Sequence, residues 1–533
     1  MTRAQNSFFN IITGVTSALL SLLLSFISRT VFIRTLGSSY LGIEGYFSNI
    51  LSVLNLANLG FGTAIVFKLY KPIETDDRRR IQVLMKLYRQ VYFAVGCVVA
   101  VLGLCLIPFL PRLVRDYGRF AQLGLSAPGV FLLYLFSTVS SYWFFAYKSA
   151  FVTAAQKTYI LTLVGYAVYI GDCVTKILVL VLTKNFILYL LVQIFFIILQ
   201  NVLNAVVCDR RYPYLKERTE DSVSKEELIG VFKDCGAMML HRTSNTVMDS
   251  TDNIVLTALV GLDVTGLYAN YLMVKKSLFH LIWTVIEATK APLGSLHSTD
   301  NAEWSRLSFR VINFLSMWLF GVGAIGIAVL LDDFIRLWAG PGYVVSFWTA
   351  GGVTVQTPLP LLIGVEFYLA GQVNYCNLFR DITGTFQQEK FRPIASALIN
   401  LTVSALLVPR LGIAGCVIGT VTAYLTTYLI FDPRIIWRVA LKQSPRGYYL
   451  RNILYKAVLI AAGLLSWWLC SLVSLAAIPG FIIHGCICVA VPCAVFSLCY
   501  WRTVEFRFVL NTCRDLLSRY VPALRPHDKE SDT

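Results

Sequence analysis

The chain has 533 residues, of which 56% are hydrophobic and only 14% are charged, and its formal net charge is +16. A typical soluble domain carries about 25% charged residues. A single soluble core stops growing at about 250–300 residues. The composition therefore excludes a large soluble protein and predicts an all-α, polytopic membrane protein in which the bilayer is the solvent for most side chains.

Fourteen apolar stretches are long enough to cross a membrane as helices. They cover residues 8–36, 41–69, 88–110, 128–153, 159–182, 186–208, 235–260, 266–294, 309–331, 350–380, 393–409, 412–437, 453–475 and 481–501. The tenth contains Pro358 and Pro360. The first is too long for a cleavable signal peptide and carries Arg29 and Arg34 late in its length.

An even number of spans places both ends of the chain on one side of the membrane. The loops expected on that side hold most of the Lys and Arg residues, for example Arg78, Arg79, Arg80, Arg210 and Arg211. Basic loops stay in the cytoplasm, so we expect both termini there, in a bacterial inner membrane. The net positive charge then follows from topology and does not indicate nucleic acid, although a role in attracting an anionic substrate stays open.

Two six-span halves are expected, joined by a polar segment. The predicted units are an N-lobe over 1–208, a cytoplasmic linker over 209–234, a C-lobe over 235–440, two extra spans over 441–501 and a basic cytoplasmic tail over 502–533. A weak repeat supports the two halves, because Gly37 and Gly42, followed by Asn49, resemble Gly261 and Gly266, followed by Asn270, at an offset of 224 residues. Transporters are often built from such repeats, with the binding site between them, but glycine pairs at tight turns also occur by chance.

Two segments have the helical spacing of apolar residues that is typical of a helix lying on a membrane surface. The longer is 502–524, where apolar residues alternate with Arg502, Arg507, Arg514 and Arg519. The shorter contains Ile81, Leu84, Leu87, Tyr88 and Val91.

Catalytic motifs are absent from the sequence. It contains no Gly-x4-Gly-Lys-Ser/Thr loop, no His-Glu-x-x-His and no Gly-x-Ser-x-Gly, and its five histidines are scattered. We therefore expect no cofactor, no metal site, no direct use of ATP and no enzymatic activity.

Polar side chains inside the spans are the informative residues, because they are costly in hydrocarbon and usually face a cavity. Several of them repeat on single helical faces. They are Arg242, Asn245, Asp249 and Asp252 in span 7; Gln193, Gln200 and Asn204 in span 6; Asp172 and Lys176 in span 5; Arg29 in span 1; Asn49 in span 2; and Asn270, Lys275 and Lys276 in span 8. These faces predict a hydrated cavity between the halves. Three alternatives stay open: the amides form hydrogen bonds between helices, Asp172 and Lys176 neutralise each other, and Arg29, near the outer end of its span, only anchors that end.

Three stretches carry a resemblance to a known family. They are Arg34-Thr-Leu-Gly-Ser-Ser-Tyr-Leu-Gly-Ile-Glu-Gly-Tyr-Phe-Ser-Asn49 with its continuation to Ile73, Thr251-Asp-Asn-Ile-Val255 with Val260 to Tyr271, and Leu411-Gly-Ile-Ala-Gly-Cys-Val-Ile-Gly-Thr420. Together they resemble the polysaccharide transporters, the flippases for O-antigen, capsule and exopolysaccharide units. That family belongs to the multidrug/oligosaccharidyl-lipid/polysaccharide exporter superfamily.

The resemblance implies two six-helix lobes around a central cavity, two extra C-terminal helices and alternating access. It also implies that the substrate is an undecaprenyl-pyrophosphate-linked oligosaccharide, moved from the cytoplasmic to the periplasmic leaflet, with a polysaccharide polymerase and other assembly proteins as partners. Such a head group needs cations along its path, and the candidates are Arg29, Arg242, Lys275 and Lys276.

Without an ATP site, the energy must come from an ion gradient or from downstream polymerisation. A carboxylate in a low-dielectric site is able to carry a proton or an ion. The candidates for this coupling are Asp172 with Lys176, Asp249 and Asp252.

Two other functions remain open. The first is an ion-coupled multidrug antiporter, which needs an acid-dominated cavity for cationic substrates. The second is a membrane polymerase or glycosyltransferase, which usually needs a sizeable loop with convergent acids or bases.

Overall fold

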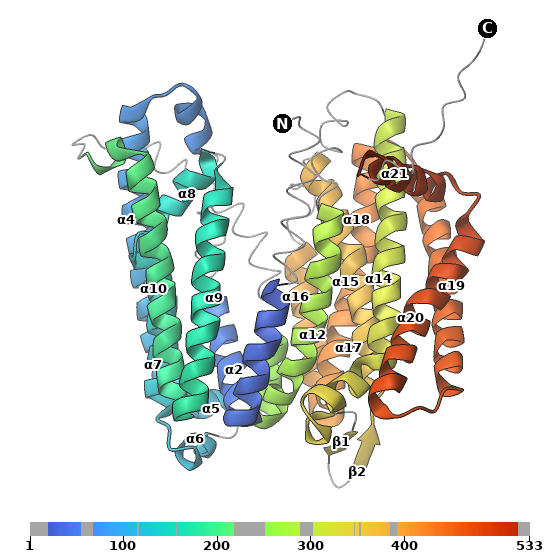
Figure 1. Ribbon diagram of the computed structural model, residues 1–533, viewed down its shortest axis with the longest axis horizontal. Helices are drawn as coiled ribbons and strands as arrows, with labels where there is room; N and C mark the ends of the chain where they lie inside the picture. The colour runs from blue at the N-terminus through green and yellow to red at the C-terminus, as the bar shows by residue number, and fades with distance from the viewer. Residues whose placement is uncertain are drawn as a thin grey trace.

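In the part of the chain that it describes, the computed structural model consists of helices and their connections, apart from one short hairpin (Figure 1). It describes residues 20–54, 68–114, 117–155, 157–217, 251–287, 302–345, 347–350, 353–383 and 392–520. The predicted all-α fold class is confirmed.

The N-terminal half contains a helix over residues 20–35 and a short helix over 68–74. The other elements are α2 (Ser38–Leu54), α4 (Arg78–Leu106), a 3₁₀ turn (Ile107–Phe109), α5 (Leu110–Leu113), α6 (Gly118–Gln122), α7 (Ala127–Trp143), α8 (Tyr147–Ala154), α9 (Thr158–Thr183), α10 (Phe186–Arg211) and a 3₁₀ turn (Pro213–Lys216). Side-chain caps fix several starts: Asp77 accepts the backbone N–H of Arg80 at 3.0 Å, and Asn185 accepts that of Ile187 at 2.8 Å.

The C-terminal half begins, within the described residues, with a helix over 251–259. It continues with α12 (Leu262–Glu287), α14 (Ala302–Trp338), a 3₁₀ turn (Pro341–Tyr343), β1 (Phe347–Ala350), β2 (Val353–Gln356), α15 (Leu359–Thr383), α16 (Arg392–Leu411), α17 (Ile413–Ala423) and α18 (Leu429–Ile435). Two π-helical segments, Tyr424–Tyr428 and Ile436–Ala440, flank α18. Pro433 lies inside α18, and such local adjustments are how a membrane helix tolerates a proline.

Each half has its own buried apolar core. One cluster joins α12, α14, α15 and α17 around Phe314, Phe320 and Tyr375. The main N-terminal cluster joins α2, α7 and α10 around Phe47, Phe131 and Leu190. Figure 1 shows the two groups of helices side by side, with α2 and α12 between them. This arrangement agrees with the predicted two-lobe architecture.

The glycine repeat lies where the two halves meet. Gly37 and Gly261 have φ angles of 91° and 136°, in the region that favours glycine, and each precedes the first residue of α2 or α12. A Cβ atom on Gly42 would overlap the carbonyl oxygen of Leu262, and one on Gly266 would overlap that of Ser38. Leu262 follows Ser38 by the same 224 residues, so the contact is reciprocal across a pseudo-two-fold axis.

Three sequence predictions need correction. Residues 350–380 are not one span, because the β1–β2 hairpin precedes α15, and Pro358 and Pro360 mark the start of the helix. The span over 128–153 is two helices, α7 and α8, bent by 46°.

The segment containing Ile81, Leu84 and Tyr88 does not form a separate surface helix. It is the first part of α4, and its apolar face is buried against Phe151 in α8 and Cys208 in α10. The amphipathic spacing in α4 therefore reflects helix packing inside the N-terminal half.

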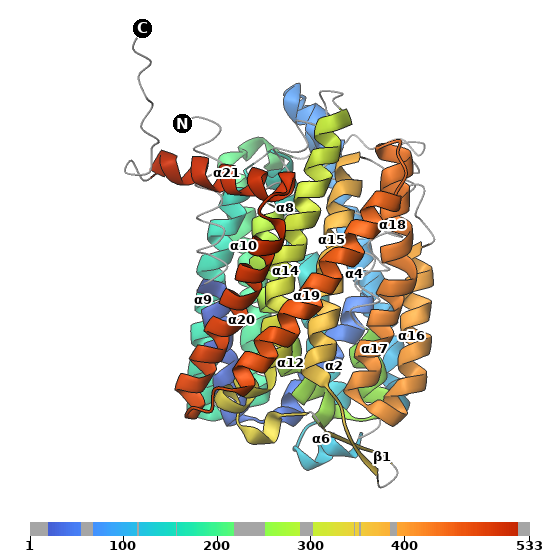
Figure 2. The same ribbon diagram turned by 90° about the vertical axis from the view of Figure 1, so that its right-hand side faces the viewer.

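The last three helices lie at the edge of the C-terminal half. α19 (Arg446–Ser471) and α20 (Ala477–Tyr500) form an antiparallel pair against α14, and α21 (Val504–Tyr520) runs across the ends of the other helices (Figure 2). Glu505 fixes α21 to the body of the protein, because its carboxylate lies 2.6 Å from Arg310 and 2.7 Å from Arg451. The orientation of α21 fits the surface helix that the sequence predicts for residues 502–524.

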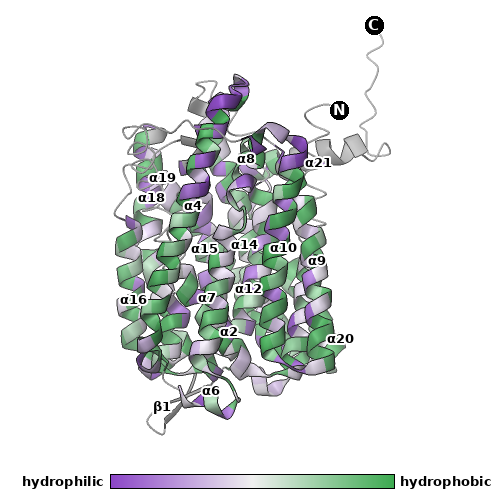
Figure 3. Ribbon diagram, turned by 90° about the vertical axis from the view of Figure 1, so that its left-hand side faces the viewer, coloured by the Kyte–Doolittle hydropathy of each residue, from purple (hydrophilic) through white to green (hydrophobic). Residues whose placement is uncertain are grey.

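Eight of the described helices are long and apolar enough to cross a membrane, or nine if α7 and α8 form one broken span. Their outward faces are hydrophobic along the middle of the molecule, and hydrophilic residues gather at the upper end of α4 (Figure 3). The protein is therefore a multi-pass membrane protein.

Candidate substrate cavity and ion site

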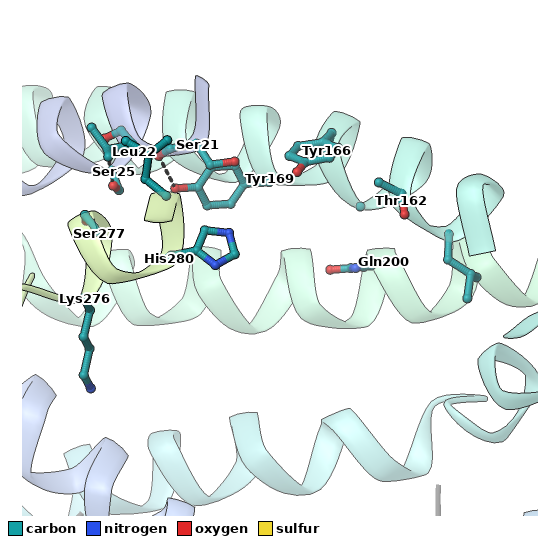
Figure 4. Close-up of a pocket in the computed structure, with 13 residues that line it drawn as sticks. Ser21, Leu22, Ser25, Thr162, Tyr166, Tyr169, Gln200, Lys276, Ser277 and His280 are labelled. Atoms are coloured by element: carbon teal, nitrogen blue, oxygen red, sulfur yellow. Dashed lines mark hydrogen bonds between the residues drawn. The ribbon is translucent and has the colours of Figure 1, made fainter. Parts of the chain in front are cut away.

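Two polar cavities lie between the halves. The larger, of about 720 Å³, is lined by the helix over 20–35, α9, α10 and α12 (Figure 4). The smaller, of about 400 Å³, lies beside it and is also lined by α2. Both volumes fall within the range of about 300–1,000 Å³ that is usual for small-molecule sites.

Arg29 lies on the N-terminal wall of the smaller cavity, in an ion pair with Glu44 at 3.1 Å. The other carboxylate oxygen of Glu44 accepts the Tyr189 hydroxyl at 3.3 Å. The Arg29 Nε also donates to the Asn270 side chain across the two halves, at 3.3 Å. The Arg29 guanidinium is therefore charge-paired in this conformation, and it connects the two walls.

Asp172 and Lys176 form a second ion pair on this wall. The Lys176 Nζ lies 2.8 Å from the carboxylate and 5.0 Å from the centre of the Tyr189 ring. Both residues line the smaller cavity. The pairing agrees with the alternative in which these two charges neutralise each other.

The two adjacent lysines of α12 have different surroundings. Lys275 points into the C-terminal half, where its Nζ lies 2.6 Å from the carboxylate of the buried Glu366 in α15. Lys276 is exposed and lines both interlobe cavities. Among the described residues it has no hydrogen-bond or ion-pair partner, so its ammonium group is available to a ligand.

Asp252 forms an oxygen-rich cluster within the C-terminal half. Its carboxylate accepts hydrogen bonds from Thr420 at 2.9 Å and from Asn400 at 3.3 Å, and Asn400 also donates to Thr420 at 2.8 Å. The Asn400 Oδ1 and the Ser404 hydroxyl are buried and have no hydrogen-bond partner among the residues that the structure describes. Oxygen donors of this kind suit a hard cation or a proton.

A void of about 30 Å³ connects this cluster to the lysines. Asp252, Thr420, Glu366, Lys275 and Lys276 all line it. Lys276 therefore borders the two interlobe cavities and the acidic cluster at once.

The remaining predicted residues have three different outcomes. Asn49 and Gln200 line the interlobe cavities, and Asn270 bonds across the halves to Arg29. Asn204 is buried within the N-terminal half, and Gln193 is partly buried on α10, away from the described cavities. Arg242, Asn245 and Asp249 lie outside the described residues.

Sequence reasoning did not single out several lining residues. Tyr166, Tyr169 and His280 line the larger cavity, and Glu366 neutralises Lys275. The tyrosines carry no charge and are common in membrane helices, so the sequence pattern of charged and amide residues does not indicate them. Glu366 could have been noticed as an acid within an apolar stretch.

Comparisons with known proteins indicate a fold. No protein-family model and no curated protein matches the sequence. The lipid II flippase MurJ in an inward closed conformation matches 92% of this chain and 99% of its own, with a TM-score of 0.64 and 11% identity.

Multidrug transporters match as well. An inward-facing multidrug resistance MATE family transporter of the MOP superfamily covers 81% of this chain and 99% of its own, with a TM-score of 0.56 and 13% identity. A Vibrio cholerae MATE transporter covers 82% of this chain and 98% of its own, with a TM-score of 0.53 and 14% identity. The chain therefore has the fold of the MOP superfamily transporters, in agreement with the superfamily that its sequence resembles.

Proposed function

We propose that the protein is a flippase that moves an undecaprenyl-pyrophosphate-linked oligosaccharide from the cytoplasmic to the periplasmic leaflet of a bacterial inner membrane, for surface polysaccharide synthesis. The observation that carries this proposal is Lys276, a cation without a described partner in a polar cavity between two lobes. The fold, which the chain shares with a lipid II flippase, supports it.

The physical requirement is a hydrated path for an anionic head group. A pyrophosphate loses its hydration in hydrocarbon, at a large free-energy cost, unless cations and hydrogen-bond donors replace the water. Lys276 is placed to contact the phosphates, and Arg29 becomes a second contact if the substrate competes with Glu44. The polyprenyl tail stays in the bilayer beside the lobes.

Alternating access requires the contact between α2 and α12 to open. At that end, the Ser39 hydroxyl donates to Asp263, and Arg119 lies 3.2 Å from the same carboxylate. The opposite end carries Arg78, Arg210 and α21. With this basic end in the cytoplasm, as the positive-inside rule favours, the α2–α12 contact is the periplasmic gate.

Coupling to an ion gradient is assigned to Asp252. Its partners Asn400 and Thr420 complete an oxygen-donor set, and the adjoining void reaches Lys276. A cation or proton that neutralises Asp252 changes the field at Lys276, and so connects ion binding to head-group binding.

Reconstitution tests the function directly. Purified protein in proteoliposomes should transfer a fluorescent undecaprenyl-pyrophosphate-linked disaccharide between leaflets, faster than protein-free vesicles. The gradient dependence follows from repeating the assay with imposed proton and sodium gradients. No transfer above the protein-free rate under any gradient would contradict the proposal.

A multidrug antiporter is the competing function, and the same vesicles test it. Cationic substrates need unpaired acids, whereas Glu44 and Asp172 are paired with Arg29 and Lys176 on the cavity wall. We expect no accumulation of a cationic dye against a proton gradient. Dye accumulation without lipid transfer would replace the flippase by an antiporter.

A further inference from the structure

The larger cavity has two chemically different parts. Figure 4 shows Lys276 at one end, Thr162 at the other, and Tyr169, His280 and Gln200 facing the space between them. Tyr166 lies on the same wall as Tyr169, three residues earlier in α9. The cation is thus confined to one end, while aromatic and neutral polar groups line the rest.

Aromatic rings beside amide and hydroxyl groups form a surface that suits sugars. One face of a pyranose ring presents C–H groups, which pack against the negative face of an aromatic ring. The hydroxyls around its edge need donors and acceptors, which Gln200, Thr162 and Ser277 supply. None of the thirteen described lining residues is acidic.

The side chains in this part have hydrogen-bonding capacity to spare. The Tyr169 hydroxyl donates to the Ser21 carbonyl at 3.3 Å, which fixes the ring on the wall. The Gln200 amide and the His280 ring have no described hydrogen-bond partner, and His280 is exposed to the cavity. A ligand can therefore form hydrogen bonds with Gln200 and His280 without first breaking a described internal hydrogen bond.

We infer that Tyr166, Tyr169, His280 and Gln200 form a binding subsite for uncharged sugars, which we call the sugar subsite. It lies next to the phosphate contact at Lys276, so the first sugar after the pyrophosphate meets Tyr169 and His280, and the next meets Tyr166 and Gln200. The subsite makes this cavity select a glycosylated lipid over the bare lipid pyrophosphate. This inference rests on the proposed function.

The volume of the larger cavity is compatible with a short sugar chain. A cavity of about 720 Å³ holds a ligand of drug-like size. A short oligosaccharide is of this size. The volume is therefore compatible with the oligosaccharide unit of the proposed substrate.

Binding of two lipids tests the subsite. The probes are undecaprenyl pyrophosphate and the same lipid carrying N-acetylglucosamine, each titrated into the full-length protein in nanodiscs. The native protein should bind the glycosylated lipid about tenfold more tightly, a preference equivalent to about 1.4 kcal/mol. Tyr166→Ala and Gln200→Ala should each reduce the preference at least threefold without changing the affinity for the bare lipid, and Tyr166→Phe should retain it.

The controls separate the possible failures. Leu163→Ala, at a strongly exposed position of the same helix outside the cavity lining, should leave both affinities unchanged. Lys276→Ala should weaken both lipids equally. An intact preference in Tyr166→Ala and Gln200→Ala would overturn the sugar subsite, whereas native protein that binds neither lipid would overturn the proposed function.

Discussion

The two walls of the interlobe space use charge in different ways. On the N-terminal wall the cations are matched by acids of the same half, Arg29 by Glu44 and Lys176 by Asp172. On the C-terminal wall Lys275 is paired inside the half, while Lys276, the next residue, faces the cavity without a described partner. This difference supports the proposal that the ion pairs of the first wall hold its helices in place and that the second wall binds the ligand.

The largest expected effect follows from breaking the pair on the N-terminal wall. Lys176→Met leaves Asp172 as an uncompensated charge in a pair whose side chains are only 11% and 17% exposed, and loss of one partner of a buried pair costs up to about 3–5 kcal/mol. Thermal unfolding of the purified Lys176→Met protein, followed by its intrinsic tryptophan fluorescence, should show a strongly lowered Tm. The double change Lys176→Met with Asp172→Leu should recover most of the loss.

The behaviour of the double variant distinguishes two roles of this ion pair, stabilising the wall and coupling transport to an ion. If the double variant is stable and still transports, the pair serves to order the wall. A stable double variant that no longer responds to an ion gradient would instead return Asp172 and Lys176 to the coupling role expected from the sequence.

Lys276→Ala tests the C-terminal wall. A charge-assisted contact with phosphate contributes about 2 kcal/mol or more, so transfer of the lipid-linked substrate should slow by roughly thirtyfold. The fold should be unaffected, because the side chain supports no described internal contact. Lys276→Arg should keep most of the rate.

Lys184→Ala provides the matched control, because Lys184 is an exposed cation at the end of α9 and lies outside the described cavities. Equal slowing by both alanine variants would show that net charge matters and that the position of Lys276 does not.

Asp252→Asn should separate ion dependence from head-group binding. The amide keeps the size of the side chain, and its single carbonyl oxygen still accepts one of the two hydrogen bonds that the carboxylate takes from Thr420 and Asn400, but it removes the charge that attracts a cation. We expect about a tenfold slower gradient-driven transfer, equivalent to about 1.4 kcal/mol. Because the amide resembles the neutralised carboxylate, the affinity for the lipid substrate should be that of the ion-bound protein and should no longer depend on the ion.

The gradient response decides the outcome. Transfer that is accelerated by the same gradient in Asp252→Asn as in the native protein would remove Asp252 from the coupling role. Asp333→Asn is a suitable control, since Asp333 lies near the far end of α14, outside the described cavities.

Much of the fold could be predicted from the sequence because the bilayer selects long apolar helices. The runs that became α9, α10, α16 and α20 were located within a few residues. The β1–β2 hairpin was missed because its residues are apolar and adjoin the apolar start of α15, so that composition alone does not separate them. The bend between α7 and α8 depends on packing, which a hydropathy pattern does not contain.

The site was less predictable, because charge pairing joins residues far apart in the chain. Lys275 and Lys276 are adjacent and chemically identical, yet Glu366, 91 residues beyond Lys275, neutralises only the first. The sequence indicates which helical faces are polar. It does not show which cation remains unpaired.

The last expected effect is a change of conformation at the reciprocal contact between the two repeats. Gly42→Ala places a methyl group against the Leu262 carbonyl, and this backbone has little room to move. Overpacking costs about 1–3 kcal/mol, which should separate α2 from α12 in part of the population without unfolding either lobe. Gly266→Ala should do the same, because it meets Ser38 in the equivalent way.

Spin labels at Ala121 and Gly342, both exposed and near this end of the two halves, report the separation by double electron–electron resonance. Gly326→Ala is the control, since a methyl group there meets no atom within 4 Å. Longer distances in both interface variants, and native distances in the control, are expected if this contact closes one side of the transport path. Unchanged distances in Gly42→Ala and Gly266→Ala would show that the glycines serve only the packing of α2 on α12, and would contradict the proposal that this contact is the periplasmic gate.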